Sequence, residues 1–360
     1  GESVRDPRIA AIDGDCVAVW SERETVSTQN CTSQGSCQPI GPRDPCFSFV
    51  PCPPGSCYEI APECTTEEAP TYRVMARPLS SAGVLGPTVL LSESGTEIGS
   101  PDIVGNVSSR LGVVSWGISN TGRNVSYAAI DSACNLDSSI STVSGQQNSR
   151  RLELDGSAAL MVWEDIGTIK CAELTVIASG ANSNIQTAEC AQPLGVHVNS
   201  SSTRASFTSK KTSPGWLVAW TDGEDVNLTS VTGLAPSTTS NINVPGRAGH
   251  ADLSCDTQDC TVAYSQTIEG RSSVILQPLS SSGLVQGAAQ TVVLEAGNQG
   301  GPRIAASGGH GLVVWEDDRS GVRELYGIGL DTSSGIVPTS DVGFLIAAGP
   351  IVSHDVVDWG

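Results

Sequence analysis

A short apolar run that ends in an aromatic residue recurs along this chain. The runs include Val-Ala-Val-Trp20, Leu-Met-Val-Trp163 and Leu-Val-Val-Trp315. All seven copies end at the following residues: Trp20, Trp116, Trp163, Trp220, Tyr264, Trp315 and Trp359. These residues are separated by 96, 47, 57, 44, 51 and 44 positions. Apart from the first gap the period is about 50 residues, the size of one four-stranded propeller blade.

The apolar runs are nearly continuous rather than alternating, which predicts strands covered on both faces, as in stacked sheets. The recurring Trp is then a packing residue between neighbouring blades, and this explains it better than a ligand-stacking role. Trp216 lies outside the repeat register, so we expect it to be exposed.

Each repeat has the same order of predicted strands. A Pro-x-Ile opening strand, as at Pro7 and Pro302, precedes the Trp strand, and two further strands follow, such as 324–330 and 343–347. No apolar stripe is long enough for a helix. The pattern predicts an all-β fold, a single β-propeller of about six four-stranded blades, or seven if a C-terminal half-repeat is completed. The predicted repeats span approximately 7–100, 101–149, 150–200, 201–249, 250–300 and 301–349, with a partial repeat at 350–360.

The first gap is too long by about one blade because it contains a Cys- and Pro-rich tract. A strand pattern resumes at Arg73, where Arg-Val-Met-Ala-Arg-Pro-Leu-Ser-Ser matches Ser273-Val-Ile-Leu-Gln-Pro-Leu-Ser-Ser. Residues 21–70 are therefore predicted to be an insertion within the first repeat.

The chain has twelve cysteines, and half of them lie in this insertion. These six are Cys31, Cys37, Cys46, Cys52, Cys57 and Cys64. Such a tract has little apolar material for a core, and its spacing contains no C-x-x-C pair, so local disulfides are favoured over zinc.

The other six cysteines lie in the repeats. Cys255 and Cys260 flank a turn and could close a hairpin between first and second strands, and Cys171 and Cys190 lie on predicted third and fourth strands of one repeat. Cys16 and Cys134 lie in neighbouring repeats and could pair only if the blades bring them together or if the insertion exchanges partners. Disulfides predict an oxidising compartment, hence a secreted or cell-surface protein.

The composition of the chain disfavours some classes of binding partner. The chain has 38 acidic and 19 basic residues, a net charge of −19, which opposes binding to nucleic acid or to anionic membranes. No apolar run is long enough to span a membrane. Five N-x-[ST] sequons mark candidate glycosylation sites: Asn30, Asn106, Asn124, Asn199 and Asn227.

The loops that follow the repeated Trp are acidic. Their carboxylates form a candidate ligand or calcium face: Glu164, Asp165, Asp222, Glu224, Asp225, Glu316, Asp317 and Asp318. Equivalent loops of a propeller meet on one face, so these groups could bind Ca²⁺ or a sugar. The alternative is that Asp and Gly are what tight hairpin turns require. Asp13-Gly14 and Asp155-Gly156 are predicted hairpin turns at the opposite end of the blades.

Motifs of known enzyme classes are absent. The sequence contains no G-x-S-x-G elbow, no H-E-x-x-H, no phosphate-binding loop and no Asp-box, and its four histidines lie in separate turns. No catalytic residue is nominated, no cofactor is expected other than Ca²⁺, and the chain is predicted not to be an enzyme.

The segment Leu312-Val-Val-Trp-Glu-Asp-Asp-Arg-Ser-Gly-Val-Arg-Glu-Leu-Tyr-Gly-Ile-Gly-Leu-Asp331 resembles the repeat of TolB-like propellers and of secreted bacterial repeat proteins. The resemblance is strong only over residues 312–331. It implies a six- to eight-bladed propeller used for protein or surface binding, and it carries over no catalytic residue.

Residues 350–360 repeat the opening strand and the Trp strand of a further unit. They predict a seventh blade, a capping hairpin, or an open array that self-associates through an unpaired edge. The leading hypothesis is a secreted or cell-surface propeller that acts as a non-catalytic binding or adhesion module for protein or glycan. The alternatives are a structural subunit of an extracellular assembly or filament, and a polysaccharide-active hydrolase with a carboxylate pair on one propeller face.

Overall fold

The structure is a computed structural model, and it describes a chain built of β-strands, with no helix among the described residues. Those residues are 3–31, 37–39, 57–59, 64–94, 97–106, 110–118, 124–144, 150–155, 158–165, 167–179, 182–196, 206–213, 215–237, 239–255, 259–293, 297–307, 309–331, 337–338, 343–349 and 354.

The strands form six antiparallel sheets that follow one another along the chain, each with a path of four strands. Sheet 1 contains β1 (Ser3–Ile12), β2 (Asp15–Cys31), β5 (Cys64–Leu79) and β6 (Val89–Ser94). Sheet 2 contains β7 (Asp102–Asn106), β8 (Leu111–Ile118), β9 (Asn124–Asp131) and β10 (Ser141–Ser144). Sheet 3 contains β11 (Arg150–Asp155), β12 (Ala158–Asp165), β13 (Thr168–Ser179) and β14 (Asn182–Glu189), and the short β15 (Gly195–Val196) pairs with β13.

Sheets 4 to 6 repeat this plan. Sheet 4 contains β16 (Phe207–Lys211), β17 (Trp216–Thr221), β18 (Val226–Thr232) and β19 (Ala235–Pro236), with β20 (Ser240–Ile242) also on β18. Sheet 5 contains β21 (Arg247–Cys255), β22 (Asp259–Ile268), β23 (Arg271–Ser280) and β24 (Gln290–Thr291). Sheet 6 contains β25 (Gln299–Ser307), β26 (His310–Asp317), β27 (Glu324–Asp331) and β28 (Val337–Pro338), with β29 (Phe344–Ala347) also on β27. The predicted unit of four short antiparallel strands is confirmed.

The Trp strand is the second strand of each sheet, and in sheets 2 to 5 it is buried on both faces. In β8 and β17 nearly every residue is buried, because one face packs on the preceding sheet and the other on the following sheet. Trp116, Trp163 and Trp315 are at most 1% exposed, and each lies in the core shared with the preceding sheet. The packing interpretation of the repeated Trp is therefore confirmed.

Trp216 corrects the sequence prediction. It is only 3% exposed, because it begins β17 and lies on the same face as Val218 and Trp220 in the core between sheets 3 and 4. Lys211 makes a cation–π contact with its ring, with Nζ 4.8 Å from the ring centroid. Trp216 lies outside the repeat register. Side chains alternate between the two faces of a strand, so Trp216 shares the buried face of Val218, two residues later.

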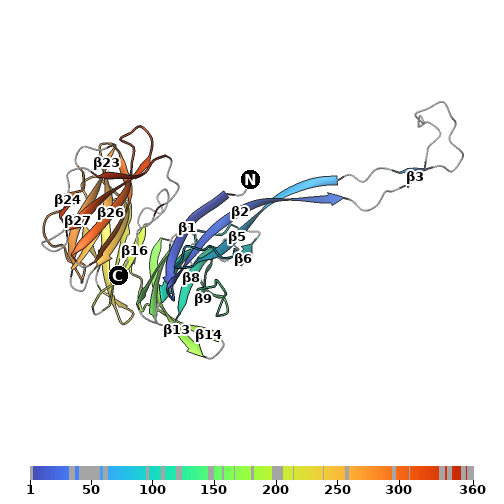
Figure 1. Cartoon of the computed structure of the whole chain (residues 1–360), viewed down its shortest axis with the longest axis horizontal. Coiled ribbons are helices and arrows are strands. Elements are labelled where there is room, and N and C mark those ends of the chain that lie inside the picture. Colours follow the sequence, from blue (N-terminus) through green and yellow to red (C-terminus); the bar gives the residue numbers. More distant parts are fainter. Residues whose placement is uncertain are drawn as a thin grey trace.

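The sheets pack face to face in chain order. Five apolar cores join sheets 1 to 2, 2 to 3, 3 to 4, 4 to 5 and 5 to 6 among the described residues. The first strands also pack in sequence, β1 on β7, then β11, β16, β21 and β25, whereas no comparable packing joins β25 to β1 in the described part of the chain. Figure 1 shows sheet 1 (blue) and sheet 6 (red) at opposite sides of the assembly.

Two aspartates brace adjacent first strands. Asp102 of β7 accepts a 2.8 Å hydrogen bond from the backbone N–H of Leu152 in β11. Asp252 of β21 accepts a 3.0 Å bond from the N–H of Ile304 in β25 and a 2.9 Å bond from the hydroxyl of Thr208. These carboxylates occupy the same register position, opposite the residue that precedes the aromatic of the second strand.

The insertion differs from its prediction at both ends. β2 continues to Cys31 and β5 begins at Cys64, in unbroken register from Cys16 and Leu79 outward, so strand pairing resumes before Arg73. β3 (Cys37–Pro39) and β4 (Cys57–Glu59) pair farther along the insertion. In Figure 1 the two long strands project away from the sheets as an arm. The second and third strands of sheet 1 are thus simply extended, which a repeat-based boundary does not reveal.

The predicted hairpin turn after β1 is present. Asp13 and Gly14 both have positive φ, 52° and 83°, as a tight two-residue hairpin turn requires. Gly156 lies outside the described residues, so the second predicted turn is not described.

Candidate functional site

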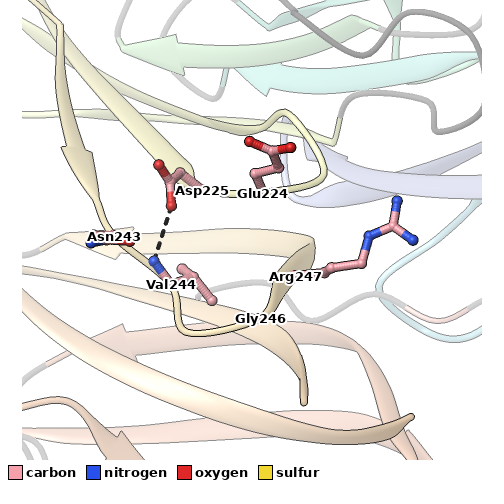
Figure 2. A pocket seen from close by; sticks show the side chains of 6 residues that line it. All are labelled: Glu224, Asp225, Asn243, Val244, Gly246 and Arg247. Carbon is pink, nitrogen blue, oxygen red and sulfur yellow. Dashed lines mark hydrogen bonds between the residues drawn. The ribbon is translucent and has the colours of Figure 1, made fainter. Parts of the chain in front are cut away.

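A polar pocket of about 460 Å³ opens where sheet 4 leads into sheet 5. It is lined by two short segments, the loop after Trp220 and the connection from β20 to β21 (Figure 2). The lining residues are Glu224, Asp225, Asn243, Val244, Gly246 and Arg247. Its volume lies within the range of about 300–1,000 Å³ that is usual for small-ligand sites.

The first segment is a turn organised by Asp222. Its Oδ1 accepts hydrogen bonds from the N–H groups of Glu224 and Asp225, at 3.0 and 2.8 Å, and its Oδ2 accepts one from Asn227 at 3.1 Å. Partial burial by itself raises the pKa of Asp222, but these hydrogen bonds to the ionised form outweigh it and lower the pKa below its usual value. The turn therefore presents residues 224 and 225 in a defined conformation.

The second segment is held against the first by backbone contacts. The N–H of Val244 donates a 3.0 Å bond to Asp225 Oδ1, and the N–H of Ala248 donates a 3.1 Å bond to the carbonyl of Glu224. Gly246 has φ of +94°, and a Cβ there would lie 2.2 Å from the carbonyl oxygen of Thr267. Only glycine fits this position, which fixes the wall of the pocket.

Three polar side chains of the pocket have no hydrogen bond or ion pair to other described residues: Glu224, Asn243 and Arg247. All three are exposed, and Figure 2 shows the Arg247 guanidinium extending from one side of the pocket and the Glu224 carboxylate from another. Together they offer carboxylate acceptors, an amide that both donates and accepts, and guanidinium donors. Such a set suits a ligand rich in hydroxyl groups.

The structure brings only two of the eight predicted face residues, Glu224 and Asp225, into this pocket. Asp165 pairs with Lys170 at 2.6 Å, and Asp318 accepts bonds from Asn298 at 2.6 and 3.0 Å. These carboxylates serve the turns and the connections of their own sheets.

Asp222 organises its own turn, and the other three face residues are also engaged or buried. Glu316 lies 3.2 Å from Arg323, Asp317 is fully buried beside Arg319, and Glu164 is 4% exposed. No group of three or more His, Cys, Asp or Glu side chains is placed to hold a metal ion in the described part of the chain. Turn chemistry accounts for most of the acidic residues after the repeated Trp.

Asn243 and Arg247 were missed by the sequence analysis. The signal that could have found them is the Asn243-Val-Pro-Gly-Arg247 turn, because connections from a fourth to a first strand lie at the same end of a blade as the loop between the second and third strands.

Two predicted disulfides are present in the structure. Cys171 of β13 bonds to Cys190, which follows β14, and Cys255 bonds to Cys260 across the β21–β22 hairpin. Cys46 and Cys52 lie outside the described residues, whereas the backbone of Cys31, Cys37, Cys57 and Cys64 is described.

Cys16 and Cys134 correct the sequence prediction, because both are free thiols. In β2, Val17 and Val19 face the core shared with sheet 2, which contains Cys134, so the alternation turns Cys16 to the opposite face. Burial, followed by the nearby Asp131 carboxylate, raises the pKa of Cys134 to about 12, so its thiol stays protonated.

The sequons lie in different settings. Asn30 is in β2, Asn106 ends β7, and Asn124 begins β9. The amide of Asn227 is engaged by Asp222, and Asn199 lies outside the described residues. Glycosylation of these residues stays a prediction.

No family model matches this chain, and no curated protein matches it. Several solved structures match it at low identity. The β-propeller domain of the Trilobed protease from Pyrococcus furiosus matches with a TM-score of 0.41 at 10% identity, over 94% of this chain and 98% of that one. The dihydro-heme d1 dehydrogenase NirN matches with a TM-score of 0.42 at 10% identity, over 78% of this chain and 65% of that one. These comparisons concern the fold alone, and one of the matched structures is a β-propeller domain.

An α-L-arabinofuranosidase (CtGH43) from Clostridium thermocellum matches with a TM-score of 0.37 at 10% identity, over 68% of this chain and 94% of that one. Glycoside hydrolases and other enzymes are thus among the structures of similar fold. We therefore correct the prediction that the chain is not an enzyme, since absent motifs do not exclude catalysis on a propeller. No helix in the described residues is long and apolar enough to cross a membrane.

Proposed function

We propose that this chain binds polysaccharide in the pocket between sheets 4 and 5. The observation that carries the proposal is the arrangement of Glu224, Asn243 and Arg247, three exposed polar side chains around one pocket without partners among the described residues. Sugar hydroxyls donate to carboxylates and accept from guanidinium and amide groups, so all three side chains would be satisfied by a saccharide.

The backbone that carries these side chains is held in place before a ligand arrives. Asp222 organises the loop, Asp225 holds Val244, and Gly246 fits against Thr267. A preorganised site loses less conformational entropy on binding. The disulfides support an oxidising, extracellular setting.

A glycan array followed by calorimetry on the best ligand tests this proposal. Arg247→Ala and Glu224→Gln should each weaken binding about 10-fold or more, since each removes a hydrogen-bonding group from the pocket. Arg323→Ala is the charge-matched control, because Arg323 lies in sheet 6 and is 65% exposed. Binding that is unchanged in both pocket variants would exclude this site.

Polysaccharide hydrolysis is the second candidate function. Glu224 and Asp225 place two carboxyl groups in one pocket in different surroundings, the first unpartnered among the described residues and the second holding Val244 and Asn241. Glycoside hydrolysis commonly uses two carboxyl groups with separate roles. Release of reducing ends would be measured at polysaccharide concentrations that saturate both the parent chain and Glu224→Gln, and loss of release in the saturated variant would support hydrolysis.

The resemblance of residues 312–331 to TolB-like propellers fits a surface-binding role and stays a prediction at the level of that family.

A further inference from the structure

Sheet 1 has an apolar face that no other sheet covers in the described part of the chain. Sheet 5 has the same face, and there it packs against sheet 4 through side chains that are at most 5% exposed: Leu253, Tyr264 and Ile275. The equivalent positions of sheet 1 carry Ile9, Trp20 and Met75. Ile9 is 40% exposed, and the other two side chains are only partly buried.

The strand register establishes this equivalence. Ile9 and Leu253 each pair with the residue two positions before the repeated aromatic of their sheet. Met75 and Ile275 each pair with that aromatic directly. In β2 the aromatic follows Val19, which lies in the core shared with sheet 2, so the apolar face points away from sheet 2. Sheet 1 therefore presents uncovered the face that sheet 5 packs against sheet 4.

Sheet 6 has the kind of face that sheet 4 uses as the cover. In sheet 4, Ala219 of β17 pairs with Leu228 of β18, and both lie in the core shared with sheet 5. The equivalent pair in sheet 6 is Val314 and Gly327. Trp315 lies in the core shared with sheet 5, so alternation turns Val314 and its partner to the opposite face.

Two side chains of β29 occupy the space over Gly327 that a leucine fills in sheet 4. A Cβ on Gly327 would lie 2.6 Å from Ile346 Cδ1 and 3.3 Å from Phe344 Cζ. Ile346 is 43% exposed and Phe344 is 54% exposed. Sheets 1 and 6 lie at opposite sides of the assembly (Figure 1), so each of these apolar faces is open to another molecule.

We propose that sheet 6 of one copy of this chain packs on sheet 1 of a second copy. The contact repeats between chains the packing of sheet 4 on sheet 5, with Phe344 and Ile346 of one copy covering Ile9 and Trp20 of the next. The two faces are different, so the contact is heterologous and adds copies end to end, into rings or open chains.

The area of the contact suits a reversible assembly. Sheet 1 has four strands, of which the first has ten residues. At about 4.8 Å between strands and about 3.4 Å per residue, its face measures roughly 500 Å². The two copies together would bury about 1,000 Å², near the lower limit for a specific interface, so the oligomers should depend on protein concentration.

Native mass spectrometry and sedimentation of the full chain over a range of concentrations test this assembly. Ile9→Glu and Phe344→Glu each place an unpaired carboxylate in the contact and should raise the concentration needed for assembly at least about tenfold. An equimolar mixture of the two variants should form dimers and nothing larger, because each variant keeps one intact face. Leu284→Glu is the control, since it changes a 64% exposed leucine of sheet 5, and it should assemble as the parent chain does.

The outcomes separate the possible partners of the two faces. A parent chain that stays monomeric at every concentration would overturn the proposal. Loss of oligomers in only one of the two variants would overturn it in favour of a symmetric contact between identical faces, and a mixture without dimers would also refute it. The pocket lies at sheets 4 and 5, so polysaccharide binding is measured separately and its absence would leave this result unchanged.

Discussion

Arg319 donates a 2.6 Å hydrogen bond from Nη2 to Oδ2 of Asp317, and its guanidinium carbon lies 4.1 Å from the centroid of the Tyr326 ring. Asp317 is fully buried and also accepts bonds from the Arg319 backbone N–H at 2.9 Å and from the Trp315 indole at 3.2 Å. Burial alone raises the pKa of Asp317, but these bonds outweigh it and lower the pKa below its ordinary value. The repeated Trp of sheet 6 is thereby tied to the loop that follows it.

Arg319→Ala should lower the free energy of unfolding by about 3 kcal/mol, because it leaves a buried carboxylate without its cationic partner. Urea denaturation measures the difference. The control is Arg323→Ala, whose partner Glu316 is near the surface, and it should cost less than about 1 kcal/mol. Equal effects of the two substitutions would contradict the role assigned to Arg319.

Asp252→Ala should destabilise the junction of sheets 4, 5 and 6. The substitution leaves the buried N–H of Ile304 and the hydroxyl of Thr208 without an acceptor, at a cost of about 2–3 kcal/mol. Hydrogen exchange should rise in β16 and β25, whereas β8 and β12 keep their protection. Asp259→Ala is the control, because Asp259 is an exposed aspartate of the same sheet. Uniform loss of protection across all six sheets would argue against a local brace.

His250 should make stability fall in weak acid. Desolvation of the ring, and then the positive charges of Arg303 and His354, lower the pKa of this surface histidine to about 4. The unfolded chain has a histidine pKa of about 6.5, so it binds the proton first. His250 therefore leaves stability unaffected above about pH 6.5 and opposes folding increasingly as the pH falls from 6.5 through 4.

His250→Gln should remove part of this pH dependence. The midpoint of urea unfolding, measured between pH 7 and pH 4, should decline less steeply in the variant than in the parent chain. His310→Gln is the control, because His310 is an exposed histidine at the start of β26. Identical slopes in all three proteins would show that His250 has the same pKa in the folded and the unfolded chain.

The two free thiols should differ in reactivity. Cys134 is buried with a raised pKa, so it should resist alkylation in the native protein at pH 8 and react only after unfolding. Cys16 is partly exposed and should react first. Mass spectrometry of alkylated peptides measures both rates. A Cys16–Cys134 disulfide in the non-reduced protein would contradict the orientation of Cys16.

Cys31 and Cys64 should form a disulfide across the arm. They face each other in the β2–β5 register, as Cys255 and Cys260 do across β21 and β22. Directly opposed residues of antiparallel strands have Cα atoms about 4.5–5.5 Å apart, a distance that suits a disulfide. Non-reducing peptide mapping identifies the link, with Cys255–Cys260 as the internal control. A Cys31 peptide joined to another cysteine of the insertion would refute this pairing.

Local patterns determined much of the fold. The aromatic repeat predicted four-stranded sheets. A strand buried on both faces shows itself as a short run of consecutive apolar residues, as in the run that ends at Trp163. The Asp13-Gly14 turn and the Cys255–Cys260 link were predictable because their partners lie close along the chain. Local geometry depends on neighbours in sequence, which the sequence displays directly.

Contacts between distant segments were decided only by the tertiary structure. Sequence alone did not show that Asn243 and Arg247 meet Glu224, because the pocket forms where two sheets join. It also did not show that Trp20 is left partly exposed while Trp216 is buried. Both tryptophans have the same intrinsic preference for burial, and the neighbouring sheet that covers one face and not another determines which of them is covered.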